Sequence, residues 1–139
     1  MWSVFNEMAE VEVRLEKSKS RRGKHAVRDL ALIVYEDCRI VEPKIKHRIK
    51  VKPIYARGEA WLVKVHIPEG AYLVHMHFIR NLRGHVKGVI RVMNSEGVEV
   101  LKVVYRKLKI RKSSGDSSYA WVVEKVVNHL KLPVKRFNV

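Results

Sequence analysis

Apolar and charged residues alternate along much of this chain, a pattern that predicts β-strands with one buried face. The clearest example is KIKHRIKVK at residues 44–52, where every second residue is Lys or Arg. The turn sequences PEG and NSEG separate further alternating segments, so two hairpins are expected there. The segments with this pattern are 10–16, 44–52, 59–67, 71–80, 85–94 and 98–112.

Two other segments carry apolar residues at helical spacing. Residues 25–38 are predicted to form an early amphipathic helix, which separates 10–16 from the later strands. Residues 119–130 are predicted to form a C-terminal helix, with Ser117 or Ser118 as its cap. The pattern as a whole predicts an α+β domain: a mainly antiparallel sheet of four to five strands, with both helices packed on one face and the other face free.

The length of 139 residues is typical of one folded domain, here residues 1–139 with a basic tail at 133–139. No apolar run is long enough to cross a bilayer and the N-terminus lacks a signal-peptide pattern, so we expect a cytoplasmic protein without a membrane partner. Cys38 is the single cysteine, which excludes a disulfide framework and a cysteine-based zinc site. The lack of Thr and Gln beside many charged residues is a bias of thermophile proteins.

The net charge of +15 is distributed unevenly along the chain. Residues 1–42 hold eight basic and eight acidic residues, whereas residues 43–139 hold 21 basic and six acidic ones, which accounts for the whole excess. Such an imbalance indicates a polyanionic partner, most often nucleic acid.

The segment 44–52 is the first candidate for binding that partner. If it is a strand, alternate side chains form a wholly cationic face: Lys44, Lys46, Arg48, Lys50 and Lys52. The opposite face would anchor the strand to the core through Ile45, Ile49 and Val51. We call such a row of alternate cations along a strand a ladder. A second, shorter ladder is formed by Lys107, Lys109 and Arg111. The alternative is that such cations keep edge strands from aggregating. The scarcity of acids after residue 43 favours phosphate binding.

Aromatic residues are interspersed among these cations, as in proteins that stack bases on flat side chains. The aromatics of the basic portion are Tyr55, Trp61, Tyr72, Phe78, Tyr105, Tyr119 and Trp121. Trp121 lies off the apolar stripe of its helix, whereas Trp61 shares a strand face with Val63 and Val65 and could be core. A flexible single strand conforms to a sheet better than a rigid duplex does. We therefore expect a largely sequence-independent binder of single-stranded DNA or RNA, with no cofactor and no catalytic residue.

The arrangement resembles that of the archaeal ThermoDBP-related single-stranded-DNA-binding proteins. The resemblance rests on GKHAVRDLALIVYEDC as an early helix, on the basic strands from KIKHRIKVK to VVYRKLKIRK, and on the C-terminal helix YAWVVEKVVNHL. It covers most of the chain. It implies a basic, apolar-lined cleft between sheet and helices in which bases are buried, with Trp121, Trp61 and Tyr119 as candidates for its lining.

A second resemblance concerns YLVHMHFI, in which His75 and His77 flank one hydrophobe on one strand. This pair is similar to the metal-binding element of HUH endonucleases, in which a tyrosine on a helix attacks a phosphodiester. It implies His75 and His77 as metal ligands and Tyr119 as nucleophile, without a third ligand evident in the sequence. An RNA-binding component of a ribonucleoprotein is a further alternative. The choice between DNA and RNA and the presence of a homodimer stay open.

Overall fold

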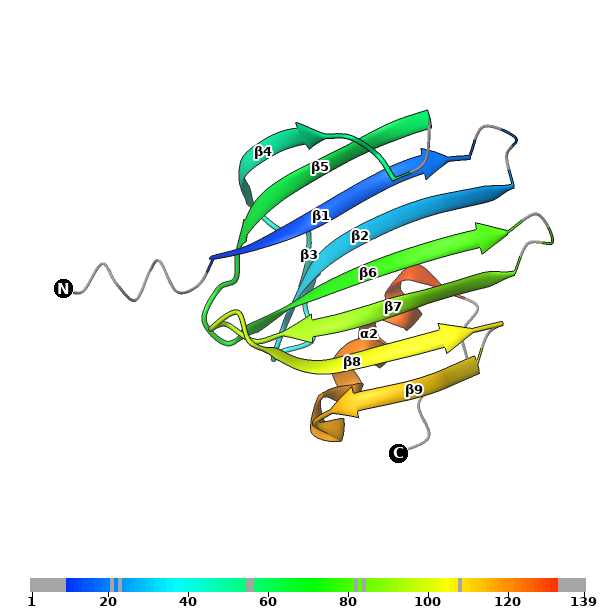
Figure 1. Cartoon of the computed structure of the whole chain (residues 1–139). Coiled ribbons are helices and arrows are strands. Elements are labelled where there is room, and N and C mark those ends of the chain that lie inside the picture. The colour runs from blue at the N-terminus through cyan, green and yellow to red at the C-terminus, as the bar shows by residue number, and fades with distance from the viewer. Residues whose placement is uncertain are drawn as a thin grey trace.

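The computed structural model describes residues 10–20, 22, 24–54, 57–81, 83, 85–107 and 109–132. Within these residues, nine strands form one antiparallel sheet in the order β4-β5-β1-β2-β6-β7-β8-β9, and β3 pairs with β2 outside this path (Figure 1). The strands are β1 (Glu10–Lys19), β2 (His25–Tyr35), β3 (Ile40–Val41), β4 (Ile45–Val51), β5 (Arg57–His66), β6 (Ala71–Asn81), β7 (Val86–Met93), β8 (Glu99–Arg106) and β9 (Lys109–Gly115).

The predicted early helix at 25–38 is wrong, because this segment forms the central strand β2. β2 is covered on both faces, so its run Ala31 to Val34 is buried at every position. A strand buried on both sides has no polar alternation, and its apolar residues then match helical spacing by coincidence. The predicted α+β domain with four to five strands is therefore wrong: the described part of the chain is mostly antiparallel β-structure, with nine strands in one sheet and one short α-helix.

The predicted strand at 98–112 is also corrected, because it is a hairpin of β8 and β9. The chain turns at Lys107, whose backbone has a positive φ of 51°. β9 then continues to Gly115, beyond the predicted end of the strand at residue 112. The turn could not be recognised from the sequence, because cations and hydrophobic residues alternate without interruption through KLKIRK. A two-residue connection leaves the two-residue period of a strand almost unchanged.

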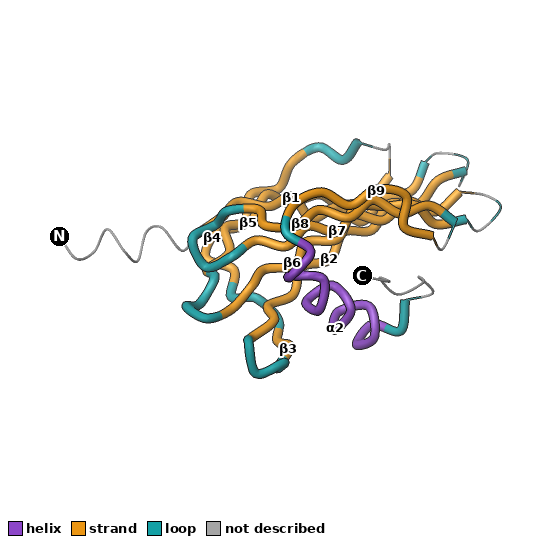
Figure 2. The backbone as a smooth tube through the Cα atoms, turned by 90° about the horizontal axis from the view of Figure 1, so that it is seen from below, coloured by secondary structure: helices purple, strands orange, loops and turns teal. Residues whose placement is uncertain are grey.

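The C-terminal helix is confirmed as α2 (Ala120–Leu130), after a 3₁₀ turn at Ser117–Tyr119. Asp116 caps that turn, rather than Ser117 or Ser118, by accepting a hydrogen bond from the Ser118 amide. α2 lies against one face of the sheet (Figure 2). It buries Val122, Val123, Val126 and Val127 in a first core that includes residues of β2, β6, β7 and β8. Among the described residues, no helix is long and apolar enough to cross a membrane.

A second core forms because β1 separates from β2. The two strands pair only from Lys17–Arg28 to Lys19–Ala26, whereas β1 pairs with β5 along its whole length. The members of this core include Val13 of β1, Val63 and Val65 of β5, Ile33 of β2 and Leu73 of β6. Ile33 alternates along β2 with Leu32 and Val34 of the first core. The second core therefore lies on the face turned away from α2, where β1 and β5 fold over β2 and β6.

Side chains of β2 and β6 bond the backbone of β1 where the strands separate. The Glu16 amide donates to Asp29 Oδ2 at 2.9 Å, and His75 Nε2 donates to the Arg14 carbonyl at 3.0 Å. Both backbone groups belong to the stretch of β1 that no longer pairs with β2. Because a buried backbone group without a partner costs stability, these two side chains allow the sheet to divide at this point. We call this arrangement the fork.

We predict that Asp29→Ala lowers the free energy of unfolding by about 2–4 kcal/mol, because it removes a buried carboxylate that bonds both the Glu16 amide and His77. Denaturant unfolding followed by tryptophan fluorescence measures the change. The control is Asp37→Ala, which removes an exposed ion pair with Arg39 and is expected to cost less than about 1 kcal/mol. Equal losses in the two variants would contradict a bracing role for Asp29.

Candidate functional site

The first predicted ladder lies on and beside β4, an edge strand of the sheet (Figure 1). A β-bulge between Ile45 and His47 interrupts its alternation. Lys46 pairs with Glu10 at 2.5 Å, whereas Arg48 and Lys50 lie over the ring of Trp61, with their cationic groups 5.2 and 6.0 Å from its centroid. The expected single cationic face is therefore wrong. Lys44 and Lys52 flank the strand and are exposed.

The predicted apolar anchors of β4 are corrected as well. Ile45 and Ile49 are 38% and 59% exposed, and Val51 is half-buried. An edge strand has a neighbour on one side only, so little packs over it.

The second ladder lies at the opposite edge of the sheet. Lys107 is in the β8–β9 turn, Lys109 begins β9, and Arg111 is at a bulge opposite Val104 and Tyr105. The structure therefore does not bring the two ladders together. Lysines and bulges on both outermost strands are the devices by which sheets avoid edge-to-edge association, which is the alternative interpretation of these cations.

The predicted stacking residues are not gathered into one site. Tyr119 and Trp121 pack against the first core beside α2, with ring centroids 5.4 and 5.9 Å from that of Tyr72. The space between sheet and helix, where the ThermoDBP-related resemblance implies a cleft, holds this core. Trp61 is half-buried on β5, in the second core. Tyr55 and the basic tail 133–139 lie outside the described residues.

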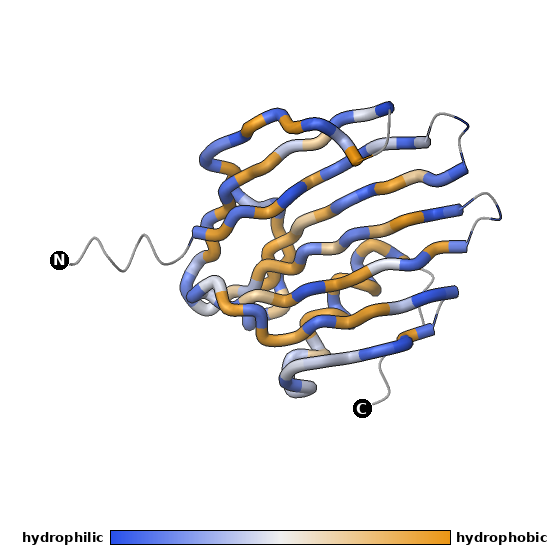
Figure 3. Tube along the Cα trace, in the orientation of Figure 1, coloured by the Kyte–Doolittle hydropathy of each residue, from blue (hydrophilic) through white to orange (hydrophobic). Residues whose placement is uncertain are grey.

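A denser group of cations lies on β7, β8 and β9, on the face turned away from α2, which Figure 1 views directly. We call it the open face. Its cations are Lys87, Arg91, Lys102, Arg106, Lys109 and Lys112. Lys102 is half-buried and the other five are exposed. Along β7 and β8 these hydrophilic positions alternate with hydrophobic ones that face the core (Figure 3).

Strand pairing places like charges of the open face directly opposite one another. Lys87 pairs with Arg106, which in turn pairs with Lys109, and Arg91 pairs with Lys102. Among the described residues, Glu99 forms an ion pair with Arg91 at 3.5 Å. Like charges in directly opposed cross-strand positions destabilise a sheet. The pattern therefore concentrates positive charge at a cost in stability.

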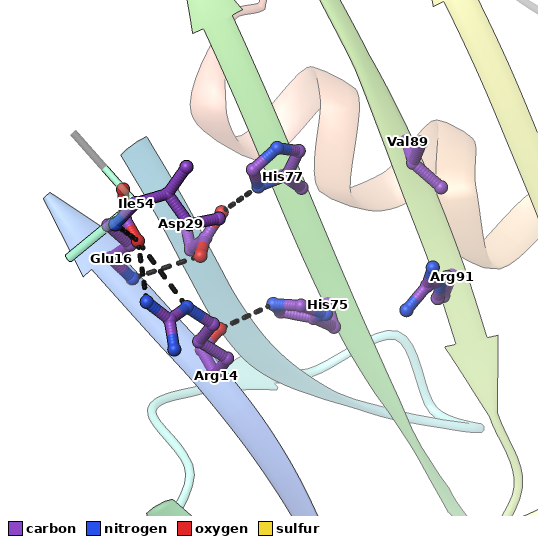
Figure 4. Close-up of a pocket in the computed structure, with 8 residues that line it drawn as sticks. All are labelled: Arg14, Glu16, Asp29, Ile54, His75, His77, Val89 and Arg91. Atoms are coloured by element: carbon purple, nitrogen blue, oxygen red, sulfur yellow. Dashed lines mark hydrogen bonds and ion pairs between the residues drawn. The ribbon is translucent and has the colours of Figure 1, made fainter. Parts of the chain in front are cut away.

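A pocket with a volume of about 250 Å³ lies where the open face meets β1 (Figure 4). Its charged or titratable lining residues are Arg14, Glu16, Asp29, His75, His77 and Arg91, and Ile54 and Val89 complete it. The strands β1, β2, β6 and β7 each supply part of the lining. Val89 and Arg91 also belong to the open face by register, opposite His77 and His75. The pocket and the open face are thus continuous.

Glu16 is the most buried charged group of the pocket, with 2% of its surface exposed. Its carboxylate accepts hydrogen bonds from the Ser18 hydroxyl, the Arg14 guanidinium and the Ile54 amide at 2.5, 3.0 and 3.1 Å. Burial opposes ionisation, but these bonds outweigh it and hold the pKa of Glu16 below its ordinary value. An ionised Glu16 in turn holds Arg14 in place.

The two histidines of the pocket are perturbed in opposite directions. His77 Nδ1 lies 2.5 Å from Asp29 Oδ1, and this hydrogen bond raises the pKa of His77 despite partial burial. Burial lowers the pKa of His75, more than the nearby Asp29 raises it. His77 therefore favours the charged form and His75 the neutral form.

The residues implied by the HUH resemblance are only partly brought together. His75 and His77 share one face of β6 and line the same pocket. Tyr119 lies at the start of α2, on the other side of the sheet, against Tyr72. In the part of the chain that the structure describes, no group of three or more His, Cys, Asp or Glu residues could hold a metal ion.

Sequence reasoning missed Arg14, Glu16 and Asp29, which come from the N-terminal part of the chain, where the charges cancel. It also missed Lys102, Arg106 and Lys112. One signal was present: Asp29, beside Arg28, interrupts the apolar residues of the segment predicted as a helix. In a buried strand such a residue indicates a polar partner. Its partners, His77 and the Glu16 amide, are distant in sequence and depend on the fork.

We predict that His77 titrates above, and His75 below, the ordinary histidine pKa of about 6.5 when followed by NMR. Asp29→Asn should lower the pKa of His77, and Asp37→Asn, a matched exposed control, should leave it unchanged. Because the folded-state pKa of His77 is raised, its ion pair stabilises the fold fully below the unfolded value and is lost as pH rises through the folded value. An unchanged His77 pKa in Asp29→Asn would contradict this pairing.

No family model, curated protein or solved structure matches the chain. The resemblances to ThermoDBP-related proteins and to HUH endonucleases accordingly remain expectations from the sequence.

Proposed function

We propose that the protein binds single-stranded nucleic acid, DNA or RNA, through its open face and without sequence preference. The observation that carries the proposal is the row formed by Lys87, Arg106 and Lys109, which lie opposite one another on three strands. Each strand could place acids or neutral residues at these positions at less cost to stability. A polyanion laid across the face offsets this repulsion.

The spacing of the open face suits a phosphate backbone. Adjacent strands are about 4.8 Å apart and alternate residues along a strand about 6.8 Å apart, which gives a grid of cations rather than one line. A flexible strand can follow such a grid on a twisted sheet, whereas a rigid duplex contacts fewer of its points. The residues that form the face include no aromatic side chain, so phosphate contacts rather than stacking supply the affinity.

The cations of the edge strand β4 and of the β8–β9 turn have a different role in this proposal. They keep the outer strands from pairing with other sheets, while the open face contacts the ligand. We also propose that the protein is located in the cytoplasm, where such ligands occur. Preference for RNA over DNA in the binding experiments would indicate a ribonucleoprotein component.

We predict that exchanging Lys102, Arg106 and Lys112 for Gln weakens binding to oligo(dT) or oligo(U) at least tenfold at low salt. If all six cations of the face contact phosphates, the slope of log affinity against log salt is about −4 for the wild type and about −2 for this triple variant. Fluorescence anisotropy over a salt series measures both quantities. A duplex of equal length is expected to bind more weakly.

The matched control carries the same loss of charge at the β4 edge, with Lys46, Arg48 and Lys50 exchanged for Gln. It should keep most of the affinity and the slope. Light scattering on the same samples reports self-association of the altered edge. A larger loss of binding in the β4 variant than in the open-face variant would assign the interface to β4 and overturn the proposal.

A further inference from the structure

The pocket lies at the inner end of the open face, and cations from three strands line it. Arg14 comes from β1, His77 from β6 and Arg91 from β7 (Figure 4). The guanidinium of Arg91 is about half-exposed and its ion pair with Glu99 is a surface contact. Neither Arg91 nor His77 bonds the backbone of β1 directly, although His77 bonds Asp29, which does.

The two carboxylates of the pocket are fully engaged by the protein. Asp29 accepts from His77 with one oxygen and from the Glu16 amide with the other. Glu16 accepts from Arg14 and the Ile54 amide with one oxygen and from Ser18 with the other. These carboxylates therefore orient the cations. When His77 is protonated, its Nδ1–H faces Asp29 and its Nε2–H is left for a ligand.

We propose that this pocket binds the terminal phosphate of a nucleic-acid strand whose backbone lies on the open face, an inference that rests on the proposed function. A terminal phosphate carries about −1.5 to −2 charges, more than the single charge of an internal phosphodiester, so it gains most where cations from three strands line one cavity. The volume of about 250 Å³ admits a phosphate group with its sugar and is below the range of pockets that enclose larger ligands.

The far wall of the pocket explains why the strand would end there. Figure 4 shows Glu16 and Asp29 on the β1 side of His77, and Arg91 on the opposite side. On the β1 side the two carboxylates are already bonded by Arg14 and His77, so a second phosphate placed there would gain no further cation. A strand can therefore extend from the pocket over β7, β8 and β9, where the cations continue, but not in the opposite direction.

The charges around His77 support the same ligand. The carboxylate of Asp29 on β2 and that of Glu16 on β1 raise its pKa, and Arg91 on β7 opposes them. His75 on the same strand favours its neutral form and adds no competing charge. The net effect raises the pKa of His77, and in its protonated form both ring nitrogens donate hydrogen bonds, as an anion requires.

The test compares one 12-mer without terminal phosphate, with a 5′-phosphate and with a 3′-phosphate, each carrying an internal fluorescent label. We expect at least one phosphorylated form to bind wild-type protein about five- to tenfold more tightly than the unphosphorylated form. Arg91→Gln and His77→Gln should reduce this ratio to about one. Arg91→Gln removes one cation of the open face whose ion pair is a surface contact, so the fold is expected to survive and the ratio of affinities decides the matter even if His77→Gln unfolds.

The control is Arg28→Gln, an exposed arginine of β2 on the face that carries α2, which should keep the wild-type ratio. A ratio near one in the wild type, or an undiminished ratio in Arg91→Gln, would overturn the inference while leaving the proposed function intact. If no oligonucleotide binds, the proposed function fails, and titration with inorganic phosphate decides the pocket separately. A saturable shift of the His77 NMR signals would support a phosphate site, and unchanged signals would reject it.

Discussion

The separation of β1 from β2 is the constraint on which the rest of the structure depends. A sheet that divides leaves backbone groups without partners, and here Asp29 and His75 satisfy those of Glu16 and Arg14. Once they do, β1 and β5 can fold over the face away from α2 and form the second core. The same side chains line the pocket, so one set of hydrogen bonds shapes both the sheet and the candidate site.

The distribution of charge follows from the same division. α2 covers the face of β6 to β8 on one side, and the folded-over strands cover part of β2 and β6 on the other. What remains uncovered is the face of β7, β8 and β9, and there six cations are set side by side. The outermost strands β4 and β9 hold further cations beside bulges, where they discourage pairing with another sheet. Positive charge in this protein thus has two locations with different physical consequences.

Local patterns predicted the parts of the fold that local interactions decide. The helix at 119–130 and the hairpin of β7 with β8 agree with their apolar spacing, because each element buries one face. The other predicted hairpin, of 59–67 with 71–80, is wrong, because β5 pairs with β1 and β6 with β2, which places β1 and β2 between them. The segment 25–38 was misassigned because a strand buried on both faces loses the alternation that identifies strands. The ladder at 44–52 was misassigned to one face because a bulge, invisible in the spacing, reverses the orientation of Lys46 relative to Arg48.

The sequence by itself determined that the chain is a strand-rich, strongly basic domain with a C-terminal amphipathic helix. These properties depend on composition and on residues near one another in the chain. Only the tertiary structure decided which cations share a surface, because the register in which two strands pair determines which of their side chains lie side by side. It alone also assembled the pocket, since the partners of His77 and Glu16 meet through hydrogen bonds across the fork. These hydrogen bonds join segments that are far apart in the sequence, and the local pattern of apolar and polar residues does not show that they meet.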